Sequence, residues 1–554
     1  MSRGNVIYNE DGDLLCCLKP GRAIELTRAN IDWTLDRLPI DIWEYHAATP
    51  DVCKYDTKVG EVMGRRIADD VRQFVRENPY EPPGAKPGNV QAYEAMGHDY
   101  LRDEGTDALR ARAELLHARG VKLVAEMRMG DTHQPRVDPA NPLVSQFLID
   151  HPQFIIERTD RIVAVALDYK FAEVRAHRLA ILREIAEEYE VDGLSLNFMR
   201  WAKYFERDWG RFYAPIMTDF IGEIRAMLDA AAKKRGTDRL LLGARVLSTE
   251  EESLGAGLDT AAWIRRGDLD YVVACEHNCS WPALNVEQFA AMAEGTNCEV
   301  YAMMGDMIGG CWNGKPDPLP RPGADAPGWT GYQRMLNRPE EARAIAANHY
   351  AWGATGIGLW NVPNNFNVHG YGKWGQDPAQ RERMQSWILE AVDPQRVQAG
   401  RRTYHYVPLY KRDYHGLERN YKYLESGRSM HGAFKGPTLY FNEGKRGRRQ
   451  ALPFRVADGR DGEKLAGTLR FRMIHCDDGD TFDADVNGAV IDAAKLRRTV
   501  DRADAEMICT WVELDLADCS PLSGDNELGL TWTSTADHGQ NVPCMEELVM
   551  TVEP

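Results

Sequence analysis

The chain has 554 residues, of which 44% are hydrophobic and 27% are charged, and its formal net charge is −17. This composition is typical of a globular protein, and the length predicts at least two compact units. The negative charge disfavours binding to nucleic acid or an anionic membrane surface, and no run of about 20 apolar residues could span a bilayer.

Residues 1–29 are interpreted as an N-terminal extension, which lacks an apolar signal core. From residue 30 to residue 395, short apolar runs alternate with longer amphipathic stretches, as in βα repeats. Seven strands are predicted, at residues 40–47, 121–129, 192–199, 239–247, 269–275, 298–305 and 354–362. An eighth, weakly marked, is placed at residues 55–62.

The helices between these strands support the same architecture. Residues 173–189 place Val174, Leu182 and Ile185 on one face at helical spacing. Another helix ends near Gly120, directly before a strand, and glycine commonly terminates helices. A run of about eight such repeats favours closure into a (β/α)₈ TIM barrel, an α/β fold, over an open doubly wound sheet.

The pattern changes after residue 395. Residues 396–460 are rich in tyrosine and charge and are interpreted as a linking segment packed on the barrel. Residues 461–554 show period-two strands separated by Asp- and Gly-rich turns, which predicts an antiparallel β-sandwich. A hairpin turn is predicted at Asn487 and Gly488. We expect this domain to buttress the barrel, with sugar binding as the alternative.

Polar residues close most of the predicted strands. Because barrel active sites lie at the C-terminal ends of the strands, these residues are the candidate site. Hydrolysis of a glycosidic bond needs an acid and a second carboxylate, and Asp131 with Glu276 is the predicted pair. Asp306 and Glu126 are the alternates.

A larger set is predicted to bind substrate. It comprises Arg128, His133, Arg200, Arg245, His277, Tyr45, Trp360 and Asn361. Tryptophans at or beyond strand ends could stack on sugar rings, and these are Trp43, Trp201, Trp281, Trp312 and Trp360. Together the two sets suit a carbohydrate cleft.

Three of these residues are arginines on consecutive predicted strands. Buried like charges repel, so Arg128, Arg200 and Arg245 should converge on a negative group. Either Asp131 and Glu276 neutralise them, or the substrate brings a carboxylate or sulfate that arginine binds in bidentate geometry.

No cofactor or metal is expected. Asp131 and His133 could ligate a metal, but no HxH pair or HExxH helix is present, and nucleotide and serine-hydrolase motifs are missing. The 11 cysteines form no CxxC pairs, which predicts reduced thiols and a cytoplasmic location unless a signal peptide has been removed. Carbohydrate is the predicted partner, and homo-oligomerisation is left open.

Several segments resemble a known family, namely residues 117–133, 167–201, 257–273 and 353–361. They are similar to the bacterial glycosyl-hydrolase-like barrels labelled family 10 glycosylhydrolase, whose Arg-Met-x-Asp-x-His run matches Arg128, Asp131 and His133. The resemblance implies a carbohydrate-active TIM barrel. Similar proteins often carry an acidic pair on strand four, where this chain has Ser195 and Asn197.

Asn197 therefore belongs to the predicted catalytic set with an open role, since an amide can orient a hydroxyl but cannot act as a carboxylate base. The leading hypothesis is a glycoside hydrolase on an oligo- or polysaccharide, with an anionic glycan considered. The second is a polysaccharide lyase in which His133 or Tyr45 removes a proton from a uronate. The third is a catalytically silent sugar-binding barrel, which Asn197 favours.

Overall fold

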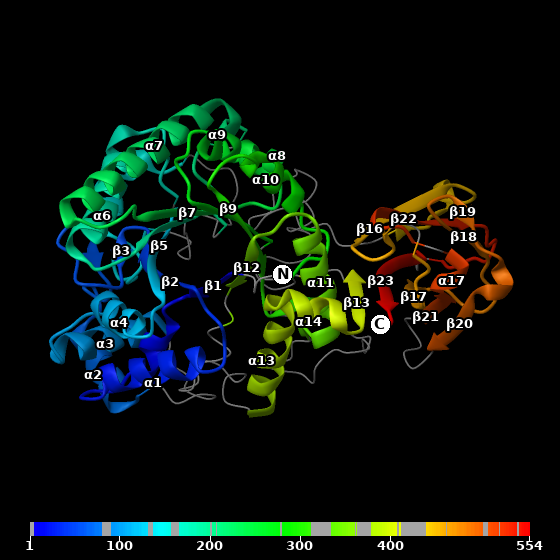
Figure 1. Cartoon of the computed structure of the whole chain (residues 1–554), viewed down its shortest axis with the longest axis horizontal. Coiled ribbons are helices and arrows are strands. Elements are labelled where there is room, and N and C mark those ends of the chain that lie inside the picture. The colour runs from blue at the N-terminus through cyan, green and yellow to red at the C-terminus, as the bar shows by residue number, and fades with distance from the viewer. Residues whose placement is uncertain are drawn as a thin grey trace.

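The structure is a computed structural model (Figure 1). It describes residues 5–79, 90–130, 137–156, 166–199, 202–206, 208–276, 280–311, 334–360, 362, 378–406, 409–410, 439–460, 463–501, 508–519, 521–539 and 542–554.

A closed barrel of eight parallel strands forms the first domain. Its strands, in chain order, are β1 (Asn5–Glu10), β2 (Ile42–Thr49), β5 (Lys122–Arg128), β6 (Gly193–Asn197), β7 (Leu241–Val246), β8 (Tyr271–Ala274), β9 (Glu299–Met304) and β12 (Gly356–Trp360). Each strand pairs with the next around the ring, and β1 pairs with both β12 and β2, which closes it. The predicted TIM barrel is confirmed.

Helices surround this barrel (Figure 1). They are α1 (Ala23–Leu35), α2 (Asp69–Glu77), α3 (Val90–Asp103), α4 (Ala108–His117), α5 (Gln146–Asp150), α6 (Ala172–Glu188), α7 (Gly210–Arg235), α8 (Glu250–Gly255), α9 (Thr260–Arg265), α10 (Val286–Ala293), α11 (Pro339–Ala351), α13 (Pro378–Val392) and α14 (Pro394–Ala399). The apolar faces of most of these helices pack with the barrel strands in one continuous core, while α5 packs with the start of α6 in a smaller cluster.

The seven predicted strands are confirmed, but the eighth is not where the sequence analysis places it. β1 lies within residues 1–29, so this segment contributes to the barrel and is not only an extension. Residues 55–62 reach only the two-residue strand β4 (Glu61–Val62), which pairs with β3 (Val52–Cys53) beyond the end of β2. β1 was not predicted from the sequence, because Asn5 and Asn9 leave it only three consecutive apolar residues.

The second domain is a β-sandwich. One sheet holds β13 (Arg402–Tyr406), β15 (Leu439–Tyr440), β17 (Gly467–Ile474), β20 (Arg497–Asp501), β21 (Cys509–Asp515) and β23 (Cys544–Val552). The other holds β16 (Arg449–Val456), β18 (Phe482–Val486), β19 (Ala489–Val490) and β22 (Gly524–Trp532), and the short helix α17 (Leu516–Cys519) follows β21. Both sheets bury their inner faces in a shared apolar core.

The predicted hairpin is present, because Asn487 and Gly488 adopt φ angles of 54° and 80° between β18 and β19. The boundary of the sandwich differs from the prediction, since β13, β15 and β16 fall within residues 396–460 yet pair with sandwich strands. β14 (Leu409–Tyr410) instead pairs with β10 (Met307–Cys311), which also pairs with β11 (Arg334–Leu336).

Buried charges join the sandwich to the barrel. His405 on β13 lies between two carboxylates, with Nδ1 2.9 Å from Glu341 Oε1 on α11 and Nε2 2.7 Å from Glu547 Oε1 on β23. Arg338 and Arg472 flank the two glutamates at 2.7 and 3.2 Å. Burial opposes charge on both His405 and Glu341, but their contacts outweigh it, so the pKa of His405 is raised and that of Glu341 is lowered.

We expect His405→Gln to lower the free energy of unfolding by about 3 kcal/mol, because it leaves two buried carboxylates without the cation between them. A raised histidine pKa stabilises the fold fully below the ordinary value of 6.5, and this contribution is lost as pH rises through the folded-state pKa. The lowered pKa of Glu341 sets the acid limit, since its contribution fades as pH falls below 4.5.

Urea unfolding of the original protein and of the His405→Gln variant, at mildly acidic and at alkaline pH, measures this loss of unfolding free energy. The control is His117→Gln, because His117 contacts Asp192 at 2.9 Å but is 39% exposed, so its loss should cost under about 1 kcal/mol. Equal destabilisation by the two substitutions, or a His405 effect that does not shrink at alkaline pH, contradicts the assignment.

Candidate active site in the barrel

A hydrogen-bonded network fills the barrel interior below the C-terminal ends of the strands. Asn9 Nδ2 donates to Glu44 Oε2 at 3.0 Å and to Glu126 Oε2 at 2.6 Å. Arg245 Nη2 donates to the same Glu126 oxygen at 2.7 Å, and the Tyr271 hydroxyl donates to Glu44 Oε1 at 2.8 Å. These five side chains are at most 1% exposed and come from β1, β2, β5, β7 and β8.

Space for this network depends on one glycine. Gly243 on β7 faces Tyr271 on β8 in register, and a Cβ at Gly243 would lie 2.0 Å from the Tyr271 ring. The missing side chain therefore lets the ring cross the interior and reach Glu44.

Burial and neighbouring charges shift the pKa values of Glu44 and Arg245. Burial, followed by the neighbouring charge of Glu126, raises the pKa of Glu44. Burial would lower the pKa of Arg245, but the charges of Glu126, Cys275 and Glu44 together with the hydrogen bond to Glu126 outweigh it, so that pKa is raised. Arg245 thus stays cationic as the partner of Glu126, while burial and the charge of Glu126 make the ionised form of Glu44 costlier than it is in water.

Arg128, the other predicted site arginine that the structure describes, is also paired with a carboxylate. Arg128, at the end of β5, forms an ion pair with Asp11, and its Nε lies 3.7 Å from Glu126 Oε1. Arg245 Cζ lies 5.5 Å from the centre of the Trp360 ring. Carboxylates that contact the two arginines thus come from Asp11 and Glu126, where the sequence analysis expected Asp131, Glu276 or a substrate anion.

Asn197 lies between these arginines at the end of β6, in register with Arg128 on one side and Arg245 on the other. Its Oδ1 accepts a hydrogen bond from the Met199 backbone N–H at 3.0 Å. It is 1% exposed. Asn197, a member of the predicted catalytic set, therefore also fixes the backbone where the chain leaves β6.

Two candidate carboxylates follow the adjacent strands β8 and β9. Glu276 and Asp306 are buried, at 6% and 5% exposed. The backbone of Asp306 is anchored by the Asn337 N–H at 3.2 Å, and Asn337 Nδ2 also donates to Ser280 Oγ at 3.0 Å. The exit of β9 is therefore held by hydrogen bonds at the C-terminal face of the barrel.

Other predicted site residues lie elsewhere. The Tyr45 ring lies 4.1 Å from Arg112 Cζ on α4, between the barrel wall and that helix. Trp43 points to the same layer, where its Nε1 donates to Glu10 at 2.8 Å. Trp281 packs against the sandwich core. Among the predicted tryptophans that the structure describes, Trp360 is the one that lies beside the hydrogen-bonded network, near Arg245.

Several predicted residues lie outside the described residues. They are Asp131, His133, Arg200, Trp201, His277, Trp312 and Asn361. Among the residues that are described, no three His, Cys, Asp or Glu side chains are grouped to hold a metal ion. Cys53, Cys275, Cys298, Cys476 and Cys519 are free thiols. Within the same described ranges, none of the helices has the length and apolar character of a membrane span.

Sequence analysis missed Asn9, Asp11 and Glu44. The first two were missed because β1 was not identified, and Glu44 because it lies inside an apolar run rather than at its end. The available signal was the run at residues 5–11, in which three consecutive apolar residues are followed by Asn9, Glu10 and Asp11.

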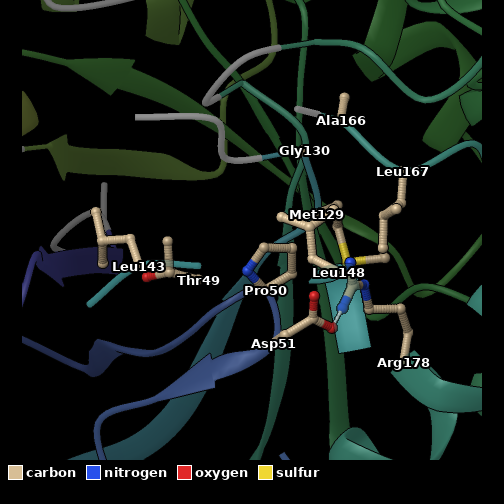
Figure 2. Close-up of a pocket in the computed structure, with 10 residues that line it drawn as sticks. All are labelled: Thr49, Pro50, Asp51, Met129, Gly130, Leu143, Leu148, Ala166, Leu167 and Arg178. Carbon is tan, nitrogen blue, oxygen red and sulfur yellow. Dashed lines mark ion pairs between the residues drawn. The ribbon is translucent and has the colours of Figure 1, made fainter. Parts of the chain in front are cut away.

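A small pocket lies beside the barrel mouth, between the turn after β2, the end of β5 and α6. Its space, including the part that is open to solvent, is about 320 Å³. Figure 2 shows Arg178 reaching from α6 to Asp51, with which it forms an ion pair. Ser145 Oγ donates to the same aspartate at 3.1 Å, so the pocket floor is a buried charge pair with internal partners.

No protein-family model matches the chain, and no curated protein matches its sequence. Solved structures with a similar fold include an alpha-L-fucosidase isoenzyme 2 from Paenibacillus thiaminolyticus, with 12% identity, a TM-score of 0.41 and coverage of 72% of this chain and 51% of that one. A Group II chitinase catalytic domain 2 from Ostrinia furnacalis gives 12% identity, a TM-score of 0.37 and coverage of 71% and 97%.

A cycloisomaltooligosaccharide glucanotransferase from Paenibacillus sp. gives 10% identity, a TM-score of 0.32 and coverage of 98% of this chain and 57% of that one. The chain thus spans little more than half the length of the glucanotransferase and the fucosidase. At these identities and TM-scores, the likenesses carry no argument about reaction or substrate.

We expect Arg245→Met to lower the free energy of unfolding by about 3–5 kcal/mol, because it strands the Glu126 carboxylate inside the barrel. The matched control is Arg239→Met. Arg239 contacts Asp270 at the same 2.7 Å but is 44% exposed, so its loss should cost about 0–1 kcal/mol. Chemical denaturation measures both, and similar values for the two variants contradict the role given to Arg245.

Proposed function

We propose that the protein is a glycoside hydrolase whose site is the C-terminal mouth of the barrel. The observation that carries the proposal is the placement of Glu276 and Asp306 after the adjacent strands β8 and β9, at the face where barrels of this type carry their active sites. The resemblance to family 10 glycosylhydrolase barrels supports the same class of reaction.

Glu276 is proposed as one of the two catalytic carboxylates, with Asp131 as its partner and Asp306 as the alternate. A glycosidase acid or base must exchange protons with substrate or water. Glu126 leaves the catalytic set, because its buried carboxylate already accepts hydrogen bonds from Asn9 and Arg245.

The substrate is proposed to be a neutral glycan. Arg128 and Arg245 each have a carboxylate of the protein within ion-pair distance, so neither needs an anionic ligand for charge balance. This weakens the lyase hypothesis, which requires cations available to a uronate carboxylate. Tyr45, the tyrosine named as an example of its base, lies between the barrel wall and α4.

Glu276→Gln should reduce kcat about 10²–10⁴-fold on a cleaved neutral oligosaccharide, since it removes a proton-transferring group and leaves the fold intact. Glu126→Gln is the contrasting variant, expected to lower stability. Reducing-end release from a panel of neutral and uronate-containing glycans measures activity, and thermal unfolding measures stability. Full activity of Glu276→Gln overturns its role, and ultraviolet absorbance of an unsaturated product would establish the lyase instead.

A second function, sugar binding without turnover, is favoured by the amide at Asn197. Under our proposal Asn197→Asp leaves hydrolysis within a few-fold of the original or lowers it, because Glu276 carries the chemistry. If the original protein binds glycans without cleaving them and Asn197→Asp gains hydrolysis, the barrel is a silent binder. Isothermal titration of the same glycans, run beside the activity assay, separates the two functions.

A further inference from the structure

An exposed aromatic corner lies at the start of α7. Trp209 and Phe212 are 50% and 69% exposed. Their rings lie 5.5 Å apart at 87°, and the Tyr213 ring lies 5.1 Å from Phe212 and 6.2 Å from Trp209. Large exposed apolar rings are costly in water and commonly mark binding surfaces.

The corner is held in place by its surroundings. Asp208 adopts a φ of 68°, which turns the chain immediately before Trp209. A Cβ at Gly210 would lie 2.2 Å from the Gly255 carbonyl oxygen, so α7 begins in close contact with the end of α8. Below the surface, Phe205 stacks on Tyr213 at 5.4 Å and 29°. The rings are therefore presented in a fixed arrangement.

Its position links the corner to the candidate active site. The connection from β6 to α7 begins after Asn197 and carries Trp209 at its end. In barrels of this type, the connection that follows each strand starts at the C-terminal face, which is also where the candidate active site lies. α8, which follows Arg245 on β7, is tied to the corner by an ion pair of 2.5 Å between Arg211 and Glu251.

We propose that this corner is a docking surface for a neutral polysaccharide chain whose cleavage site lies in the barrel mouth; the proposal rests on the proposed glycosidase function. One ring offers a face to the apolar side of a pyranose, and the perpendicular ring flanks it. Arg211, which lies between Trp209 and Phe212 in the chain, is paired with Glu251, so this pair leaves no surplus positive charge to attract a polyanion.

A protein partner fits the patch less well. Protein interfaces combine aromatic anchors with a broader apolar core. The other large exposed apolar side chains of the described residues lie on other segments: Val59, Val71, Phe74, Val137, Tyr440, Val490, Leu522 and Val542. The corner is thus aromatic and small, which suits one or two sugar rings.

The test is affinity gel electrophoresis of the full chain in gels containing soluble β-glucan, α-glucan or galactomannan, with polygalacturonate as the anionic comparison. The variant is Trp209→Ala with Phe212→Ala. The control is Phe74→Ala, since Phe74 is 49% exposed on α2, away from this corner. We expect a neutral glycan to retard the original protein and the control, and the double variant to bind it about tenfold more weakly.

Polygalacturonate should retard none of them. Unchanged retardation of the double variant, or no retardation of the original protein by any neutral glycan, overturns the inference. So does light scattering that shows a dimer of the original protein and a monomer of the double variant, because the corner is then a self-association surface.

Hydrolysis assays separate this inference from the proposed function. If both are right, the double variant cleaves short oligosaccharides at the original rate and long chains more slowly. If the original protein cleaves nothing but loses retardation in the double variant, docking stands and the glycosidase proposal fails. If long and short substrates are cleaved equally by both proteins, the docking surface is refuted while the glycosidase proposal stands.

Discussion

Pairing of buried charges inside the barrel is the constraint on which the rest of the structure depends. An isolated ion in this interior would cost several kcal/mol, so every charge must be matched in place. Glu126 meets this demand through Arg245 and Asn9, which lie on two other strands. Since side chains alternate along a strand, a register slip of one residue would turn them out of the interior and leave the carboxylate alone. The network therefore selects a single register for the barrel.

The same constraint explains what the sequence could and could not predict. Seven barrel strands were predicted because strands buried on both faces read as apolar runs flanked by helices. β1 was missed because it carries Asn5 and Asn9. An amide inside the barrel makes sense for Asn9 only once Glu44 and Glu126 are known to face it. The partners of a polar residue inside the barrel come from strands that are far apart in the sequence. A short sequence window therefore does not contain them.

The arginines show this limit at the candidate site. Their placement on consecutive predicted strands led to the expectation of negative partners, and Arg128 and Arg245, the two that the structure describes, each have one. The partner of Arg128 is Asp11, 117 residues earlier in the chain, and Asp11 follows the strand that the sequence analysis did not identify. Spacing in the sequence indicates which charges are buried, but the closure of the barrel decides which of them meet.

Internal charge balance also limits how the site can select a ligand. Once Arg128 and Arg245 are occupied by Asp11 and Glu126, they act through the side chains they hold in place. Arg245 supports Trp360 from 5.5 Å, so the indole is held beside a fixed cation at the mouth. Under the proposed function, such a site is expected to discriminate by shape and stacking more than by charge, which is the recognition that a neutral sugar ring requires. The hydrogen-bonded network then contributes to the site by keeping it rigid. If one of its side chains moved, a buried partner would lose its hydrogen bond.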